Sequence, residues 1–396
     1  MARLRGICAV GVAGCRCDNC GMSAWRWDIF CTVIDNYGDI GVCWRLARQL
    51  ASEHDADVRL WVDDLASHSR LLGDGDVSAS GVAVHHWCQD AAPDASADVV
   101  VAGFGCRLPE TYIAAMAARP RAPVWINLEY LSAEAWVEGC HLLPSPHPRL
   151  PLTEYFYYPG FTRQTGGLLR EARLLEARDA FRRDPAAHAA LWQCLGVDAP
   201  SSDSLRISLF AYENPALPDL LQAWSVGVNE IWCGVPQGRV WKSVEDWLGV
   251  PLSLGRAERR GRLVLAPLRF VDQPRYDQLL WSCDVNFVRG EDSFVRAQWA
   301  GRPLVWHIYR QDEAAHLVKL DAFLGRLVAG LAERDAEVLR RMHRVWNAGG
   351  AIVSAWADFM AALPRLREHA EVWCRDLAAQ RDLAAGLAQF AKIKLK

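Results

Sequence analysis

The sequence predicts an α/β protein built from two parallel, doubly wound sheets, with helices at its C-terminal end. Three features of the 396-residue chain support this fold class. Strand and helix patterns alternate in the first half, the turn-rich segment 197–204 interrupts them, and the alternation then starts again. Strands separated by helices are typical of parallel sheets, and this length exceeds one ordinary core. We therefore expect two domains joined by that segment.

The first half carries five short apolar runs of the kind that form buried strands. They lie at residues 29–34, 58–62, 82–87, 99–102 and 124–128. An amphipathic helix is expected after the first strand, because Val42, Leu46 and Leu50 recur at helical spacing. Another helix is expected around 112–118, ahead of the last of these strands.

A proline-rich stretch at 142–159 precedes a long helical pattern at 170–195. Because proline removes a helical hydrogen bond, that pattern is expected to break or kink at Pro185. Beyond the linker, strands are expected at 205–210, 230–233, 263–266, 285–288 and 304–306, with a helix at 217–224. The tail from 336 to 396 is predicted to be helical.

These patterns predict two Rossmann-like domains that face each other across a cleft. The expected parts are an extension at 1–21, a first domain at 22–196, a linker at 197–204, a second domain at 205–370 and a C-terminal helix at 371–396. This arrangement is that of the GT-B glycosyltransferase fold. Periodicity does not separate that class from two-domain dehydrogenases or periplasmic-type binding proteins. In each class, ligands are expected at the domain interface.

Composition narrows the function classes. A net charge of −3 argues against a general nucleic-acid binder, which carries a basic excess. No apolar run approaches the roughly 20 residues that span a bilayer, so no membrane partner is expected. Nine of the thirteen cysteines are scattered after residue 30, often within apolar runs. This pattern favours reduced, buried thiols in a cytoplasmic enzyme over a disulfide framework.

Residues 1–21 differ from the rest of the chain. A basic start precedes a short apolar stretch, and residues 12–15 are similar to a lipoprotein cleavage box. The stretch is short and interrupted by glycine, which disfavours export. Its four cysteines lack a familiar zinc-ligand spacing. We interpret this segment as a non-native extension, with Met22 as the start of the functional chain.

Residues 35–41, directly after the first predicted strand, place Asp35 and Asp39 in a tight glycine turn. Loops at the carboxyl ends of parallel strands bind ligands, so paired carboxylates there are candidates for chemistry. The alternative is a plain turn in which Asp39 caps the following helix. A full glycine fingerprint for a nicotinamide cofactor does not follow the strand, which disfavours an oxidoreductase.

Residues 289–299 place a glycine turn and polar side chains ahead of another helix. Free amides at a helix N-terminus suit a diphosphate, and Glu291 could accept hydrogen bonds from a sugar hydroxyl. The alternative is a simple cap by Asp292 or Ser293.

Segments 208–214 and 270–276 add aromatic side chains near strand ends. A base ring could lie between them while Gln273 bonds its polar edge, or the aromatics could belong to the core. The acidic pair at residues 55–57 precedes a strand, so we interpret it as a solvated turn. With no cluster of metal-ligand spacing after residue 22, we expect no metal requirement.

Taken together, these motifs resemble the EarP family, the protein-arginine rhamnosyltransferases that modify elongation factor P. The similarity runs from Trp27 to near the C-terminus. The most specific segments are residues 35–41, 44–48, 60–64, 127–132, 143–146 and 289–294.

The resemblance implies a GT-B fold and transfer of L-rhamnose from dTDP-β-L-rhamnose to one arginine of elongation factor P. It implies inversion at the anomeric carbon, without a metal or another cofactor, since dTDP-rhamnose is a co-substrate. It assigns the general base to Asp39, with Asp35 as a second essential aspartate and Glu291 as a third catalytic candidate. The implied nucleotide-sugar site comprises Tyr37, Gly38, Phe210, Tyr212, Phe270, Gln273, Tyr276, Arg289, Glu291, Asp292 and Ser293. Tyr276 stands where some relatives carry Phe, which keeps the stacking face.

An arginine guanidinium stays charged in water, so its proton is expected to leave as the new bond forms. Asp39, helped by Asp35, is expected to bind the guanidinium and accept that proton. The acceptor protein is expected to dock on the first domain, near Asp63, Asp64 and Glu129. Two alternatives stay open: a transferase of this fold with another nucleotide sugar or acceptor, and a non-catalytic protein that binds an elongation factor.

Overall fold

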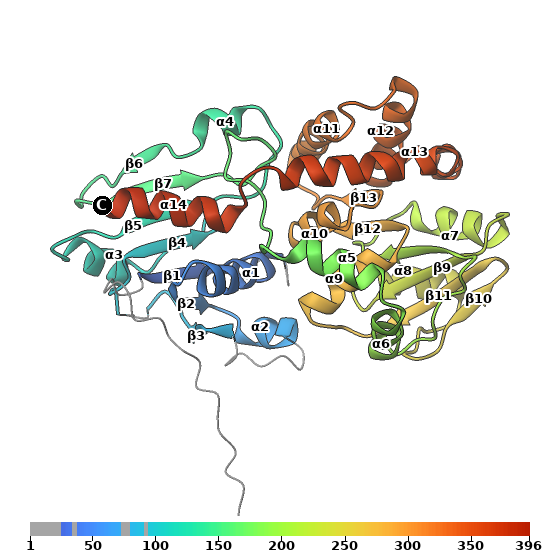
Figure 1. The fold of residues 1–396 in the computed structure, drawn as a ribbon, viewed down its shortest axis with the longest axis horizontal. Coiled ribbons are helices and arrows are strands. Elements are labelled where there is room, and N and C mark those ends of the chain that lie inside the picture. Colours follow the sequence, from blue (N-terminus) through green and yellow to red (C-terminus); the bar gives the residue numbers. More distant parts are fainter. Residues whose placement is uncertain (1–24, 34–37, 73–79, 91–93) are drawn as a thin grey trace, which may run out of the picture.

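The computed structural model describes residues 25–33, 38–72, 80–90 and 94–396. Its two sheets lie in successive halves of the chain, side by side in Figure 1. We call the part built on the β1–β7 sheet the first lobe and the part built on the β8–β13 sheet the second lobe. The predicted α/β class is confirmed. The predicted extension, Asp35 and Tyr37 lie outside the described residues.

The first sheet has the strand order β3-β2-β1-β4-β5-β7-β6. Its strands are β1 Arg26–Cys31, β2 Asp57–Val62, β3 Val82–His86, β4 Val99–Gly103, β5 Val124–Leu128, β6 Pro144–Pro146 and β7 Thr153–Tyr157. The helices are α1 Gly38–Glu53, α2 Leu65–Leu72, α3 Glu110–Ala117 and α4 Trp136–Cys140. The strands pair in parallel except β6 with β7. The chain reverses its direction of winding between β1 and β4, which is where such sheets bind ligands.

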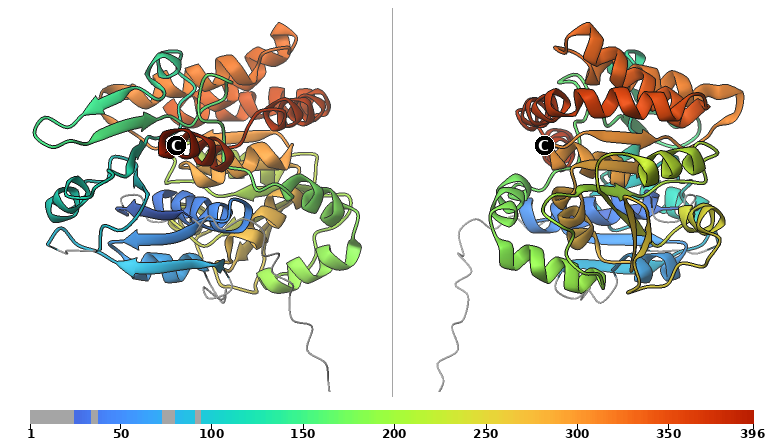
Figure 2. Two further views of the ribbon diagram at one scale, coloured as in Figure 1. Left: turned by 60° about the vertical axis from the view of Figure 1, so that its left-hand side comes forward. Right: turned by 90° about the vertical axis from the view of Figure 1, so that its right-hand side faces the viewer.

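The second sheet has the order β10-β11-β9-β8-β12-β13. Its strands are β8 Leu205–Leu209, β9 Ile231–Pro236, β10 Glu258–Arg260, β11 Leu263–Leu268, β12 Val285–Arg289 and β13 Leu304–His307. The helices are α7 Leu217–Val226, α8 Val240–Leu248, α9 Gln273–Ser282, α10 Asp292–Ala300, α11 Ala315–Leu327, α12 Glu333–Ala348 and α13 Ile352–Ala378. Figure 2 shows α12 and α13 together beside this sheet. Without the antiparallel edge strand β10, its winding repeats that of the first sheet, with the reversal between β8 and β12.

The chain crosses between the lobes at both ends of the second lobe. Helices α5 Leu174–Arg182 and α6 Pro185–Leu195 precede the predicted linker, yet Phe181 and Trp192 pack in the core of the second lobe. Helix α14, Leu383–Leu395, returns to the first lobe, where Leu387 and Phe390 join its core (Figure 1). The predicted domain boundaries therefore stay a prediction.

Local sequence signals explain most elements. Helix α6 starts at Pro185, with Asp184 accepting hydrogen bonds from the next free amides, as expected for proline at the first helical position. The break predicted at Pro185 is confirmed. The prediction missed β6 and β7 in the proline-rich stretch. Strand β6 tolerates Pro144 and Pro146 because it lies at the edge of the sheet.

Two further findings concern membranes and thiols. No helix formed by the described residues combines the length and the apolar character that a membrane span requires. The nine cysteines after residue 30 are free thiols, and most are buried, whereas Cys88 is exposed.

Candidate active site

The first turn of α1 and the segments that follow β8, β11 and β12 bring the described candidate residues to one place between the lobes. Helix α1 begins at Gly38 and carries Asp39 in its first turn, where the helix dipole favours a carboxylate. Asp39 is only 5% exposed. After β12, Gly290 adopts a positive φ of 61°, which glycine permits, and α10 follows at Asp292.

Two adjoining cavities occupy this interface. The aromatic cavity is lined by residues such as Phe210 and Tyr276, and the acidic cavity by Asp39, among others. Gly38, Gly290 and Glu291 line both cavities, so a molecule could extend from one into the other.

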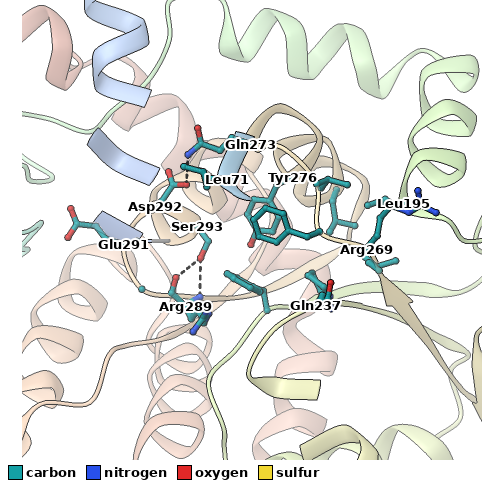
Figure 3. A pocket seen from close by; sticks show the side chains of 18 residues that line it. Leu71, Leu195, Gln237, Arg269, Gln273, Tyr276, Arg289, Glu291, Asp292 and Ser293 are labelled. Atoms are coloured by element: carbon teal, nitrogen blue, oxygen red, sulfur yellow. Dashed lines mark hydrogen bonds between the residues drawn. The ribbon is translucent and has the colours of Figure 1, made fainter. Parts of the chain in front are cut away.

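The aromatic cavity gathers most of the predicted nucleotide-sugar residues (Figure 3). Those that line it are Gly38, Phe210, Phe270, Gln273, Tyr276, Arg289, Glu291, Asp292 and Ser293. Tyr212 is not among the lining residues and lies buried against Arg289. The lining residues that were not predicted include Leu71, Leu195, Gln237 and Arg269. Leu71 comes from α2, so both lobes form this cavity.

Arg289 is the clearest anion-binding group in the aromatic cavity. Its guanidinium carbon lies 4.6 Å from the ring centroids of both Phe210 and Tyr212. The residue is 7% exposed, and its Nη1 has no hydrogen-bond partner among the described residues. A buried guanidinium nitrogen without a partner suits a phosphate oxygen.

Ser293 and Glu291 shape the turn into α10. The Ser293 hydroxyl accepts a hydrogen bond from the Arg289 amide at 3.1 Å and donates one to the Arg289 carbonyl. Glu291 occupies the N-cap position, but its side chain makes no capping hydrogen bond. Its Oε2 instead accepts a hydrogen bond from the Leu131 amide of the first lobe, at 3.2 Å.

Asp292 and Gln273 bond to one another and to the first lobe. Asp292 Oδ1 accepts a hydrogen bond from Arg45 Nε at 2.9 Å, and Asp292 Oδ2 accepts one from Gln273 Nε2 at 3.1 Å. Gln273 Nε2 also donates to the Gly41 carbonyl at 3.0 Å. Gln273 Oε1 has no partner among the described residues. That oxygen is therefore the atom of Gln273 available to a ligand.

The acidic cavity joins Asp39 to Glu291 from opposite lobes. Besides these two carboxylates, it is lined by Gly38, Tyr130, Leu131, Gly290, Phe294, Trp306, Ile308, Tyr309, Gln311 and Lys319. Burial, the charges of Asp39 and Glu291 and a hydrogen bond with Asp39 raise the pKa of Tyr130. The Tyr130 ring also stacks on Phe104, with centroids 4.8 Å apart. A cavity with the Asp39 carboxylate, a second acidic side chain and an aromatic wall suits a guanidinium cation.

Burial raises the pKa of Glu291 to about 8, and the charges of Asp39 and Asp292 act in the same direction. The Leu131 amide and Lys319 oppose this shift. The folded state therefore holds a proton that the unfolded chain releases near pH 4.3. The resulting stabilisation is present below that pH and is lost as the pH rises through about 8.

Glu291→Gln should remove this pH dependence, because the glutamine side chain resembles the protonated carboxyl group in shape and does not titrate. We expect the melting temperature of the variant, relative to the parent, to rise by a few degrees between pH 5 and pH 9. Thermal melts at both pH values measure this difference. The matched control is Glu368→Gln, an exposed position on α13, for which the difference should stay flat. If the melting temperature of Glu291→Gln, relative to the parent, fell as the pH rises, the raised pKa of Glu291 would be contradicted.

The sequence prediction did not include the residues of the first and second lobes that complete the acidic cavity. Tyr130 and Leu131 follow β5, while Ile308 and Tyr309 follow β13. Their position after the carboxyl ends of parallel strands was the available signal. Lys319, on α11, has no such signal.

The predicted docking carboxylates have local partners. Asp63 accepts a hydrogen bond from the Val33 amide, and Asp64 accepts hydrogen bonds at the start of α2. Glu129 accepts one from the Asn127 side chain. Docking at these residues stays a prediction.

The described part of the chain contains no group of three or more His, Cys, Asp or Glu side chains that could hold a metal ion. Asp57, expected in a turn, is instead the first residue of β2, where it forms an ion pair with Arg26 at 2.8 Å. That the reaction needs no metal stays a prediction.

Two doubly wound sheets, with a basic aromatic cavity and an acidic cavity lined by residues of both lobes, are the arrangement of the GT-B fold. A solved structure of Acinetobacter baumannii MurG shares this fold, with a TM-score of 0.52 and 12% identity, over 93% of this chain and 99% of that chain.

A more specific match identifies the family. The family described as "Elongation-Factor P (EF-P) rhamnosyltransferase EarP" matches residues 27–392, and the chain belongs to this family. It is 51% identical to the protein-arginine rhamnosyltransferase of Pseudomonas putida, over 93% of this chain and 99% of the relative. The protein-arginine rhamnosyltransferase of Pseudomonas aeruginosa is 50% identical, over 92% and 98%.

A solved structure described as the structural basis for EarP-mediated arginine glycosylation of translation elongation factor EF-P is also similar. Its TM-score is 0.69 at 39% identity, covering 93% of this chain and 99% of that chain.

Proposed function

We propose that this chain transfers L-rhamnose from dTDP-β-L-rhamnose to a guanidinium nitrogen of one arginine in elongation factor P, with inversion at the anomeric carbon. The observation that carries the proposal is the acidic cavity, in which Asp39 and Glu291 from opposite lobes adjoin the aromatic cavity. The relatives named above support the sugar and the acceptor residue.

In the proposed donor site, the thymine ring lies among the aromatic residues, and the diphosphate binds Arg289 and the amides at the start of α10. These groups offer charge-assisted hydrogen bonds to the leaving diphosphate. Gln273 Oε1, which lacks a partner among the described residues, would accept a hydrogen bond from the nucleotide sugar. The rhamnosyl group then lies near Glu291, where the two cavities meet.

The acceptor arginine enters the acidic cavity. Its guanidinium nitrogen attacks the anomeric carbon as the bond from that carbon to the diphosphate oxygen breaks. Inversion requires the nucleophile to lie opposite the leaving group, which fits an acceptor near Asp39 and a donor near Arg289. The proton lost from the attacking nitrogen passes to Asp39, and dTDP leaves with the bonding electrons. Glu291 positions the sugar. We assign Asp35 a role in supporting Asp39.

We place this reaction in the cytoplasm and expect it to need no metal or further cofactor. Preorganised charges then supply the electrostatic stabilisation that a metal gives in other transferases. Activity that is abolished by a chelator and restored by a divalent cation would contradict this part of the proposal.

Mass spectrometry of elongation factor P tests the reaction. The factor is incubated with this chain and dTDP-rhamnose, and one deoxyhexose is expected on a single arginine. A factor with that arginine changed to lysine is the control and should gain no sugar. Nuclear magnetic resonance of the modified arginine should report the α-anomer, which follows from inversion of a β-donor. Modification with a different nucleotide sugar, and none with dTDP-rhamnose, would overturn the proposal.

A further inference from the structure

A buried network of charges joins the two lobes directly behind the cleft. Arg45 on α1 donates from Nη1 and Nη2 to Asp277 on α9, at 3.1 Å each, and from Nε to Asp292 on α10, at 2.9 Å. Arg296 on α10 binds the same Asp277 at 2.9 and 2.6 Å, and Glu171 at 2.7 Å. The side chains of Arg45, Arg296 and Asp277 are at most 5% exposed.

Stability does not explain why such a network is present. Removing ionised groups from water is costly, and apolar replacements of buried ion pairs are often as stable. A network of this kind does fix geometry, because charge-assisted hydrogen bonds from a planar guanidinium are directional. Each of its cross-lobe bonds connects α1 with α9 or α10.

These helices carry the proposed reacting groups. Arg45 lies six residues after Asp39 on α1, about 9 Å along the helix axis. Its partner Asp292 directly follows Glu291. The Arg45–Asp292 bond therefore connects the helix that presents Asp39 with the helix whose first turn follows Glu291.

A second contact lies closer to Asp39. Gln273 Nε2 bridges the Gly41 carbonyl and Asp292 Oδ2. A Cβ atom at Gly41 would lie 3.1 Å from Asp292 Oδ2 and 3.3 Å from Gln273 Nε2. Such contacts are tighter than usual, so a methyl group at Gly41 would require the Asp292 and Gln273 side chains to shift by a few tenths of an ångström.

We propose that Arg45 is a positioning residue for the transfer reaction, and that its bonds to Asp277 and Asp292 set the separation of Asp39 from Glu291 across the acidic cavity. Arg45 does not line either cavity. It acts through α1 and α10. This inference rests on the proposed function, since it assigns the separation of the two carboxylates a role in that reaction.

The test compares three variants with the parent enzyme. Arg45→Met removes the network's cross-lobe donor, and kcat should fall about 100-fold, the scale expected for misplacement by about 1 Å. Arg45→Lys keeps one charged contact and should recover part of that loss. Gly41→Ala keeps every charge and should lower kcat about tenfold. For all three, the affinity for dTDP should stay within about twofold of the parent.

The matched control is Arg59→Met. Arg59 forms a two-bond ion pair with Asp28, at 2.6 Å for each bond, within the first lobe; the Asp28 side chain is fully buried and that of Arg59 is 14% exposed. Its loss should lower the melting temperature and leave kcat unchanged. Hydrogen exchange provides a readout independent of activity: peptides covering α1 and α10 should exchange faster in Arg45→Met and not in Arg59→Met.

The outcomes separate this inference from the proposed function. If the parent enzyme does not modify elongation factor P, the proposed function fails, and hydrogen exchange still tests whether Arg45 orders the two helices. If the parent is active, kcat within threefold of the parent in folded Arg45→Met overturns the positioning role. If Arg45→Met does not fold, Arg45→Lys and Gly41→Ala decide: parental kcat in both overturns the role.

Discussion

Asp39→Asn should lower the turnover of arginine modification by about 10²–10⁴-fold, the range typical of a lost general base. Asparagine keeps the size of the side chain and one acceptor oxygen, so the fold of the first turn of α1 should persist. It cannot take the proton that leaves the guanidinium as the new bond forms. The carboxylate also attracts the cationic acceptor, and this attraction is lost with the charge.

Single-turnover assays with saturating donor measure the effect on the chemical step. The affinity for dTDP should change less than about twofold, because the aromatic cavity is unaltered. Asp184→Asn is a matched control: Asp184 is also an acid at a helix N-terminus, where it caps α6 and lines neither cavity. Near-normal turnover in Asp39→Asn would refute the catalytic assignment.

Arg289→Met should weaken dTDP binding by about 100-fold, which corresponds to the loss of about 2–3 kcal/mol for hydrogen bonds to a charged group. The proposed partner of the Arg289 guanidinium is the diphosphate. Methionine keeps much of the packing against Phe210 and Tyr212 without the charge. The melting temperature of the ligand-free protein should not fall, because the variant removes a buried charge that has an unpartnered nitrogen.

Calorimetric titrations with dTDP and with thymidine show whether the lost affinity comes from the diphosphate or from the base. The affinity for thymidine should change little, because thymidine has no diphosphate. The control is Arg239→Met, which changes an exposed arginine whose guanidinium carbon lies 5.9 Å from the Tyr212 ring centroid. Equal losses for dTDP and thymidine in Arg289→Met would show that the residue supports the base rather than the diphosphate.

The sequence predicts the parts of this site that depend on local pattern. Apolar runs and helical spacing identify the parallel strands, and the reversal points then place Asp39, Phe210 and Arg289 at one interface. Strand β7 was missed because the surrounding prolines obscure the apolar pattern, although it extends the sheet beside β5. Boundaries and edge strands depend on neighbours that a local pattern does not contain.

The remaining features arise from contacts between distant segments. Arg45 and Asp292 are 247 residues apart in the chain. The sequence analysis singles out the segments that hold both residues, but the pairing exists only once both lobes are formed. Lys319 likewise reaches the acidic cavity from a helix with no motif. Local propensity carries no information about such cross-lobe pairs, which are visible only in the three-dimensional structure.

The return of α14 to the first lobe has a consequence for biosynthesis. Its 13 residues supply Leu383, Ala384, Leu387, Phe390 and Ala391 to a core whose other buried members come from the first half of the chain. Domains generally fold as units while the ribosome extends the chain. Here the first lobe lacks part of its interior until α14 has been translated. Nascent chains should therefore expose that apolar surface until then, and removal of α14 would destabilise the first lobe.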